Sequence, residues 1–233
     1  MPNKLKDLLS KKLTEKQLAL LPSSYDVVGS ILIFSDFPEQ LSKKEKIIGN
    51  EILKNYRQIK SVLKKSRKYS GKYRTPKLKL LAGENSREAE YRENNIRLKL
   101  DVEKVYFSPR LSEERKRIFQ QIKNNESVLV MFSGVAIYPI VIAKNTKAKN
   151  ITAIELNPIA HKYALENLKL NKIKNIYLIK GDVKKVLPKI NKEFDRIIMP
   201  LPKGAEHFLK LALSKIKKKG IMHFYSFAEE NKY

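Results

Sequence analysis

The sequence predicts an α/β fold in which a mainly parallel sheet is preceded by a small α+β domain. From residue 128 to residue 227, short apolar and β-branched segments alternate with helical segments, which is the spacing of βαβ units. The first 110 residues carry strands and helical segments without that regular alternation. Because strands joined by right-handed crossovers lie parallel, the second part is expected to form a Rossmann-like sheet.

The chain begins with a helical segment and a strand segment. Residues 1–20 are expected to form one Lys-rich amphipathic helix, which ends before Pro22 because proline disfavours helical geometry in the preceding residue. The β-branched and aromatic segment 25–34 predicts a strand, or a hairpin folded near Gly29. Apolar residues at helical spacing then predict a helix within 41–62.

A basic loop and a hairpin are expected next. In 64–79, lysines and arginines are interleaved with tyrosines and few residues suit a core, so we expect an exposed loop. Two short strands, 88–91 and 96–100, are joined by Glu-Asn-Asn, a turn composition that tolerates positive φ. These elements make up the small α+β domain, residues 22–110, which follows the basic helix of residues 1–21.

The second domain, residues 111–233, contains the alternating elements. Ser112 is expected to cap its first helix, 113–123, whose early glutamates suit the positive end of the helix dipole. The predicted strands are 128–132, 151–156, 176–179, 194–199 and 221–227, and the predicted helices are 138–144, 160–170 and 205–216.

Composition indicates the class of partner. The 233 residues include 49 Lys and Arg against 24 Asp and Glu, a formal net charge of +25. This field attracts polyanions, so nucleic acid is the first partner to consider, and lysines that only solvate helix faces are the alternative. The chain has no cysteine, which excludes disulfides and thiolate metal sites. It lacks an apolar run suited to a membrane span or signal peptide, so we expect a cytoplasmic protein without membrane contact.

Polar residues follow the carboxyl ends of the predicted strands. Gly134 lies in a small-residue turn that lets a ligand approach the backbone, and the absence of G-x-G-x-x-G disfavours a dinucleotide pyrophosphate site. Glu155 could accept from two ribose hydroxyls and Asp182 from an adenine amino group, although either acid alone could be only a helix cap. Three strand tips in register indicate a nucleoside pocket. The candidate cofactor-binding residues of this domain are Phe132, Gly134, Glu155, Leu156, Asp182, Val183 and Pro200.

Several segments resemble one enzyme family. They are 22–29 (Pro-Ser-Ser-Tyr-Asp-Val-Val-Gly), 80–84 (Leu-Leu-Ala-Gly-Glu) and 101–115, which contains Val-Tyr-Phe-Ser-Pro-Arg-Leu. These segments are similar to the archaeal and eukaryotic tRNA (guanine-N1)-methyltransferases, which modify position 37 beside the anticodon, and the similarity spans 22–227. The resemblance implies a class I methyltransferase domain, S-adenosyl-L-methionine (SAM) as cofactor, tRNA as partner through its anticodon region, and no metal.

The resemblance also assigns catalytic roles. Arg74 is expected to stabilise negative charge on guanine O6, and Glu114 to take the proton from N1. A base is needed because N1 of neutral guanine carries a proton and has no available lone pair. The alternative is that Glu114 is only a first-turn helix acid and Arg74 only a phosphate contact. The resemblance further places Arg110 with the cofactor, and Tyr106, Arg115 and Pro202 with the substrate RNA.

Some positions depart from the family pattern. Val130 and Ala136 stand where relatives usually have an acid and a second glycine, so cofactor binding is expected to be weaker or differently arranged. Pro200 replaces an asparagine that helps to hold the target base in many relatives. With Pro202 it forms a rigid elbow, or only stops the strand.

Two larger differences concern the ends of the chain. The separate domain that relatives use to sense the outer corner of tRNA is not expected here, and relatives add further elements after the fifth strand. The sheet is therefore expected to have an open edge, either in a monomer or covered by a partner. Rival hypotheses are methylation of another tRNA base or of a wyosine precursor, and a catalytically inactive tRNA-binding module.

Overall fold

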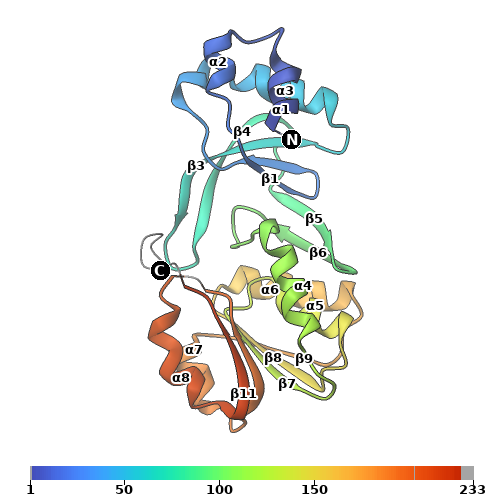
Figure 1. Ribbon diagram of the computed structural model, residues 1–233, viewed down its shortest axis with the longest axis vertical. Coiled ribbons are helices and arrows are strands. Elements are labelled where there is room, and N and C mark those ends of the chain that lie inside the picture. The colour runs from blue at the N-terminus through green and yellow to red at the C-terminus, as the bar shows by residue number, and fades with distance from the viewer. Residues whose placement is uncertain (1, 202, 227–233) are drawn as a thin grey trace. The chain divides into compact units, whose positions relative to one another are not determined.

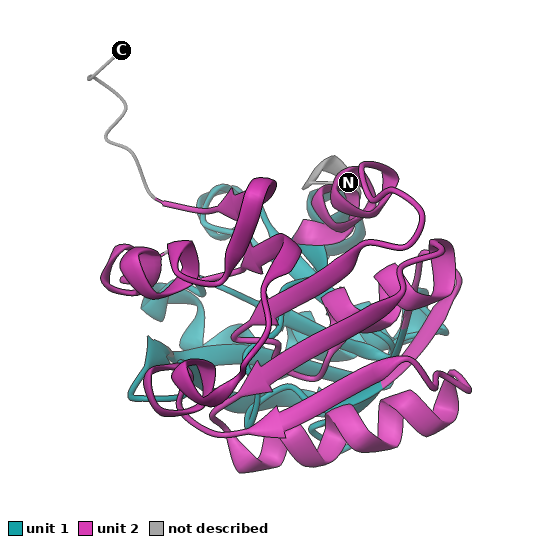
Figure 2. Ribbon diagram, turned by 90° about the horizontal axis from the view of Figure 1, so that it is seen from below, with its two compact units in different colours: residues 1–91, 99–110 teal, residues 92–98, 111–233 magenta. Residues whose placement is uncertain are grey.

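The computed structural model describes residues 2–201 and 203–226, and the chain divides into two compact units (Figure 2). Unit 1 comprises residues 1–91 and 99–110, and unit 2 comprises residues 92–98 and 111–233. Within the described ranges, no helix is both long and apolar enough to cross a membrane.

Unit 1 is built on a mixed sheet in the order β1-β2-β3-β4 (Figure 1). β1 and β2 form a hairpin, the second of the two alternatives for this segment, and Gly29 at its turn has φ +58°. Because β2 and β3 are parallel, the chain returns between them through the helical segment η1 and α3. The elements are α1 (Pro2–Leu9), α2 (Glu15–Ala19), β1 (Tyr25–Val28), β2 (Ile31–Phe34), η1 (Glu39–Lys44), α3 (Glu45–Asn55), β3 (Ser61–Ser70) and β4 (Thr75–Gly83).

The first twenty residues form two helices, so the prediction of one continuous helix is wrong. α1 ends at Leu9, and Thr14 begins α2 with a capping box. In this box the Thr14 hydroxyl accepts from the N–H of Gln17 at 3.4 Å, and the N–H of Thr14 donates to Gln17 Oε1 at 3.1 Å. The break brings leucines of α1 and of the segments on either side of α2 into the core, and Leu18 of α2 packs against it half-buried. That core comprises Leu5, Leu9, Leu13, Leu21, Leu32, Phe34, Leu41, Ile48, Ile52, Ile59, Val62 and Leu81.

The segment 64–79 is a long hairpin, so the prediction of an exposed loop is wrong. β3 and β4 pair antiparallel from Ser61 opposite Gly83 to the turn that joins them, with register shifts along the ladder. Backbone hydrogen bonds stabilise this ribbon while many of its basic side chains are exposed, so apolar alternation marks it only near its end, at Pro76 and Leu78. The helix predicted within 41–62 also stops early, at Asn55.

Unit 2 contains the predicted α/β fold. Its sheet has the order β11-β10-β7-β8-β9, and all neighbouring strands in it are parallel. The sequence placed every strand, but β11 starts before the predicted 221 and the last helix is shorter than predicted. The elements are α4 (Ser112–Gln120), β7 (Ser127–Met131), α5 (Ile137–Asn145), β8 (Asn150–Glu155), α6 (Pro158–Leu170), β9 (Ile176–Lys180), α7 (Val183–Val186), η3 (Leu187–Lys189), β10 (Phe194–Met199), η4 (Ala205–Phe208), α8 (Leu209–Leu213) and β11 (Ile216–Phe224).

Helices cover both faces of this sheet (Figures 1 and 2). Leu129 and Met131 of β7 pack with Ile197 and Met199 of β10 in the core beneath α7, η4 and α8. α4, α5 and α6 pack together beside the sheet. The strand order reverses between β7 and β10, and in such sheets ligands bind beyond the carboxyl ends of the strands at this point.

A two-stranded hairpin links the units in sequence. It consists of β5 (Glu88–Glu93) and β6 (Ile96–Asp101), and Asn94 and Asn95 at its turn have φ +41° and +63°, which confirms the predicted hairpin. The predicted cap of the next helix is wrong, because the N-cap of α4 is Leu111 and it makes no side-chain cap bond. Ser112 lies inside α4, where its carbonyl and hydroxyl oxygens accept from the Asn94 side-chain amide at 3.3 and 3.4 Å.

Candidate functional site

In the turn after β7, several residues adopt a left-handed backbone conformation on either side of Ser133, whose hydroxyl is buried. Phe132 has φ +57°, Gly134 has φ +58°, and Ala136, the N-cap of α5, has φ +65°. At a non-glycine residue this conformation costs on the order of 1–3 kcal/mol and is concentrated at functional sites. Ser133 is 3% exposed, and its hydroxyl has no hydrogen-bond partner within the described residues. A buried polar atom without a partner is unfavourable, so this hydroxyl is suited to a polar ligand.

Glu155 connects this turn to the tip of β8. Its Oε2 accepts from the N–H of Gly134 at 2.7 Å, and its Oε1 accepts from the N–H of Asn157 at 2.6 Å. Burial raises the pKa of the Glu155 carboxyl, and the backbone N–H groups of Asn157, Gly134 and Leu156 act against that rise. The carboxylate is thus held in one orientation, and its oxygens have further lone pairs for ligand hydroxyls.

The tip of β9 has the helix-cap geometry that the sequence left open as an alternative. Asp182 is the N-cap of α7, and its Oδ1 accepts from the N–H of Lys184 at 2.9 Å. Among the described residues no hydrogen bond engages its other oxygen, Oδ2. Val183 is 3% exposed and belongs to the core, so it contributes shape rather than polar contacts.

The elbow after β10 is only partly described. Pro200 is half-buried, and the N–H of Leu201 donates to the carbonyl of Met199 at 2.7 Å, which makes a tight turn around the proline. Pro202, a candidate RNA contact, lies outside the described residues. The predicted positions after β7, β8, β9 and β10 therefore all lie at the same edge of one parallel sheet.

Two residues that sequence reasoning missed support the turn after β7. The ring of Phe208 packs edge-on against Phe132, with 4.8 Å between ring centroids. Asn167 of α6 is completely buried, and its Nδ2 donates to the carbonyl of Val135 at 3.2 Å. The available signal was an asparagine at helical spacing from Ala160 and Ala164, on the buried face of α6, since a buried amide requires partners.

Glu114 lies in the first turn of α4 and is held by two side chains. Arg117 donates to both carboxylate oxygens, each at 2.7 Å, and the Tyr225 hydroxyl donates to Oε1 at 2.6 Å. The hydrogen bond from Arg117 lowers the pKa of Glu114, burial acts against it, and the bond from Tyr225 lowers it further. Glu114 is consequently ionised near neutral pH and can accept a proton. Neither partner was foreseen from the sequence.

Arg115 differs from the expectation of an RNA contact. Its side chain is 2% exposed and forms a bidentate ion pair with Glu93, with both nitrogen–oxygen distances at 2.5 Å. The guanidinium also lies 5.9 Å from the ring centroid of Tyr138. Because a buried guanidinium requires an opposite charge, Arg115 anchors α4 inside unit 2 and is not presented to solvent.

Three further candidates, Arg74, Tyr106 and Arg110, lie close to one another in unit 1. Arg74 has φ +50° at the β3–β4 turn, and its charge acts against the burial that raises the pKa of Tyr106. The rings of Tyr106 and Tyr69 lie 5.0 Å apart between centroids. Arg110 pairs with Asp26 at 2.6 Å, and its charge also acts on Tyr69. The result is a patch of two arginines and two tyrosines in unit 1, whereas the other cofactor candidates belong to unit 2.

Two family descriptions cover most of the chain. The TRM5/TYW2 methyltransferase domain matches residues 89–233, and the TYW2 N-terminal domain matches residues 5–86. In the described residues, no group of three or more His, Cys, Asp or Glu side chains is arranged to hold a metal ion.

Three relatives illustrate the similarity. The Trm5b tRNA (guanine(37)-N(1))-methyltransferase of Pyrococcus abyssi is 43% identical over 98% of this chain and 67% of its own length. Its crystal structure matches with a TM-score of 0.84, covering 94% of this chain and 64% of that one. The complex of aTrm5 and tRNALeu gives a TM-score of 0.84 at 35% identity, covering 95% of this chain and 65% of that one.

The third relative carries a broader name. The tRNA (guanine(37)-N(1))/4-demethylwyosine(37)-methyltransferase Taw22 of Nanoarchaeum equitans is 40% identical over 89% of this chain and 84% of its own length. The chain thus spans about two thirds of the length of the Trm5 proteins that it matches. With its strand order, its strand-tip carboxylate and these matches, the chain belongs to the TRM5/TYW2 methyltransferase family.

Proposed function

We propose that the chain is a SAM-dependent tRNA methyltransferase that transfers a methyl group to N1 of guanine 37. The observation that carries the proposal is the Glu155 carboxylate at the tip of β8, which is fixed by the N–H groups of Gly134, in the turn after β7, and of Asn157. A carboxylate in this position can accept hydrogen bonds from a ribose. Family membership then favours SAM over a dinucleotide as the nucleoside ligand.

The residues present fit a nucleoside. The partnerless hydroxyl of Ser133 and the oriented carboxylate of Glu155 are polar groups suited to the ribose and its substituent, and Asp182 Oδ2 is suited to the adenine amino group. Left-handed backbone at Gly134 lets a ligand approach the turn closely. When bound, SAM supplies an electrophilic methyl group on a sulfonium.

Glu114 and Arg74 are proposed as the catalytic residues. As N1 of guanine gains the methyl group, its proton passes to the Glu114 carboxylate, which the low pKa keeps ionised beforehand. The Arg74 guanidinium stabilises the negative charge that develops on O6. Because the two roles differ, a separate variant tests each of them. Arg74 belongs to unit 1 and Glu114 to unit 2.

The RNA partner is proposed from charge and family. A net charge of +25 favours a polyanion, and the relatives are named as tRNA enzymes. We assign RNA contacts to the small N-terminal domain, 22–110, through Tyr106 and the basic β3–β4 ribbon, and cofactor binding to residues 111–233. The anticodon region is the proposed contact, since position 37 adjoins the anticodon.

Methyl transfer from labelled SAM to a tRNA transcript tests this proposal. Transfer should require guanine at position 37 and should fall by about 100-fold or more in Glu114→Gln, because a general base contributes roughly 10²–10⁴-fold. Glu113→Gln, in the same helical turn, is the matched control for the base, and Arg67→Ala on the β3–β4 ribbon is the control for Arg74→Ala. Activity of Glu114→Gln within threefold of Glu113→Gln would refute the assigned base.

A second candidate substrate is 4-demethylwyosine at position 37. It is favoured by the 40% identity to Taw22, whose name includes both substrates. Nucleoside mass spectrometry on tRNA that carries 4-demethylwyosine distinguishes the two activities. A new methylated product from that tRNA, with none from guanine 37, would replace the guanine assignment. If neither tRNA is methylated while SAM and tRNA both bind, an inactive tRNA-binding module is the better description.

A further inference from the structure

A basic groove lies at the edge of the unit 2 sheet opposite the candidate cofactor site. It has a volume of about 710 Å³ and is lined by residues at the amino ends of β7, β8, β10 and β11. Its charged side chains are Lys149, Lys192, Lys215, Lys217, Glu193 and Asp195, and its amides are Asn125, Asn150 and Asn191. A five-residue strand such as β7 spans roughly 16 Å, so this groove is separate from the Glu155 edge.

The lysines of the groove lie close enough to repel one another. Burial lowers the pKa of Lys192, and the charges of Lys217 and Lys149 lower it further. Lys192 donates to the side-chain oxygen of Asn150, and Lys217 donates to Asp195 at 2.8 Å. An anion in the groove would relieve this repulsion between ammonium groups.

A second hollow of about 270 Å³ continues the groove. The two hollows share Asn125, Asp195 and Lys217, and the second adds Lys123, Lys218 and Lys219. Within the described residues, no ion pair or hydrogen bond engages the ammonium groups of Lys123, Lys149 and Lys218. These cations are therefore available to an external ligand.

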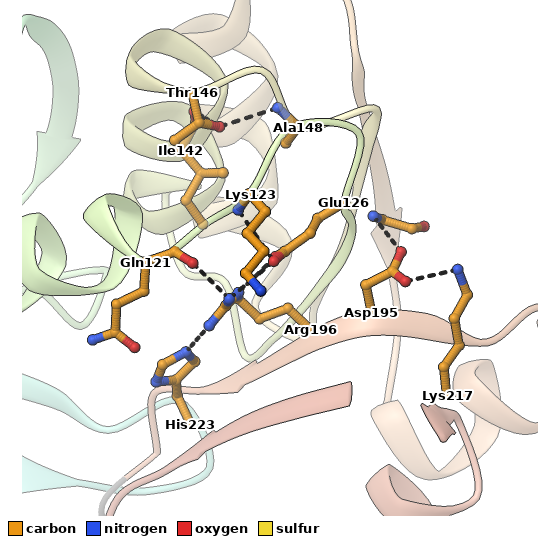
Figure 3. A network of polar contacts seen from close by, with 11 residues as sticks. Gln121, Lys123, Glu126, Ile142, Thr146, Ala148, Asp195, Arg196, Lys217 and His223 are labelled. Carbon is orange, nitrogen blue, oxygen red and sulfur yellow. Dashed lines mark hydrogen bonds and ion pairs between the residues drawn. The ribbon is translucent and has the colours of Figure 1, made fainter. Parts of the chain in front are cut away.

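Two of the three carboxylates that line the hollows are already engaged inside the protein. Glu126 forms a bidentate contact with the buried guanidinium of Arg196, at 2.7 and 3.0 Å (Figure 3). Asp195 accepts from the N–H of Ser127 and from Lys217, each at 2.8 Å. The third carboxylate, Glu193, lines the groove and is exposed, but the lysines of the two hollows outnumber it and dominate the field.

We propose that this amino-edge groove binds the phosphate backbone of RNA, as a second RNA surface beyond the proposed catalytic site. Lysines spread over two connected hollows suit a chain of phosphates better than one small anion. Its cations are all lysines, point charges that contact phosphates without the bidentate geometry by which arginine reads bases. The surface thus adds affinity without sequence selectivity. The inference rests on the proposed function only in taking RNA as the ligand.

The test compares two triple variants that remove the same charge. Lys123→Gln/Lys149→Gln/Lys218→Gln neutralises groove lysines whose ammonium groups have no partner among the described residues, so folding should be preserved. Lys162→Gln/Lys169→Gln/Lys172→Gln neutralises exposed lysines on and just after α6, which do not line either hollow. Binding of an unmodified tRNA transcript is measured without SAM over a salt series, and calorimetric SAM binding checks that each variant is folded.

The groove variant should bind the transcript about tenfold more weakly at 0.1 M salt. The slope of the logarithm of its binding constant against the logarithm of the salt concentration should become shallower by about 2–3, since each phosphate-contacting lysine contributes about one unit of slope. Equal losses in the two triple variants would overturn the proposal, because they would report only net charge. Weaker binding of pyrophosphate with unchanged RNA affinity would also overturn it and indicate a small-anion site. Absence of methyl transfer in the unmodified protein would count against the proposed function and leave this binding comparison unaffected.

Discussion

Neutralising Glu126 by Glu126→Gln is expected to destabilise unit 2 strongly. Arg196 is fully buried, and its guanidinium donates to Glu126, to the carbonyl of Gln121 at 2.8 Å and to Nε2 of His223 at 2.7 Å (Figure 3). Glutamine keeps the shape of the side chain and removes the only carboxylate among these partners. A buried cation then lacks its counter-charge, which costs about 3–5 kcal/mol.

The lower end of that range applies, because the Glu126 side chain is 12% exposed and water can screen part of the charge. A loss of about 3 kcal/mol corresponds to a fall in Tm of roughly 6–12 °C for a protein of this size. Urea denaturation followed by circular dichroism measures the change, with the exposed Glu193→Gln as a control expected within about 0.5 kcal/mol of the unmodified protein. The double variant Glu126→Leu/Arg196→Met should lose less than Glu126→Gln, since no buried charge is left unpaired. If Glu126→Gln unfolds at the same urea concentration as Glu193→Gln, the ion pair does not stabilise the fold in this way.

Three further predictions concern other parts of the chain. Burial lowers the pKa of His223 from 6.5 to about 4, so the stability that this histidine contributes is complete above pH 6.5 and is lost as the pH falls toward 4, by about 2 kcal/mol at pH 5. His223→Gln should remove this pH-dependent component when urea unfolding is compared at pH 7 and pH 5. An unchanged pH dependence in that variant would contradict the assignment. Gly83→Ala should cost more than about 2 kcal/mol of stability in the same assay, because the added Cβ, at φ +90°, would lie 2.1 Å from the carbonyl oxygen of Lys60. Gly71→Ala, at φ +72° with no heavy atom within 4 Å of the added Cβ, should cost about 1 kcal/mol. Equal losses in the two variants would show that the close contact at Gly83 relaxes. Arg117→Gln should raise the pKa of Glu114 and move the acidic limb of the methyl-transfer pH profile to higher pH, and an unmoved limb would argue against Glu114 as the base.

Much of the candidate cofactor site could be predicted from sequence because its signals are local. Strand-forming runs end close to Gly134, Glu155 and Asp182, and the carboxyl ends of parallel strands meet at one sheet edge whatever the details of packing. The Asn94–Asn95 turn was equally clear, since its residues tolerate the left-handed backbone that they adopt. Ser133 was missed because only burial without a partner distinguishes it from any other serine.

What the sequence by itself determined is therefore the strand order along the chain in unit 2, its parallel sheet and its strand tips, because periodicity and turn chemistry act over a few residues. Tertiary structure alone decided the long-range contacts. The ribbon at 64–79 depends on pairing between its strands, and Arg115 is withdrawn from solvent by Glu93, 22 positions away. Tyr225 reaches Glu114 across 111 positions. The amino-edge groove arises in the same way, because strand ends that are distant along the chain meet at one edge of the sheet.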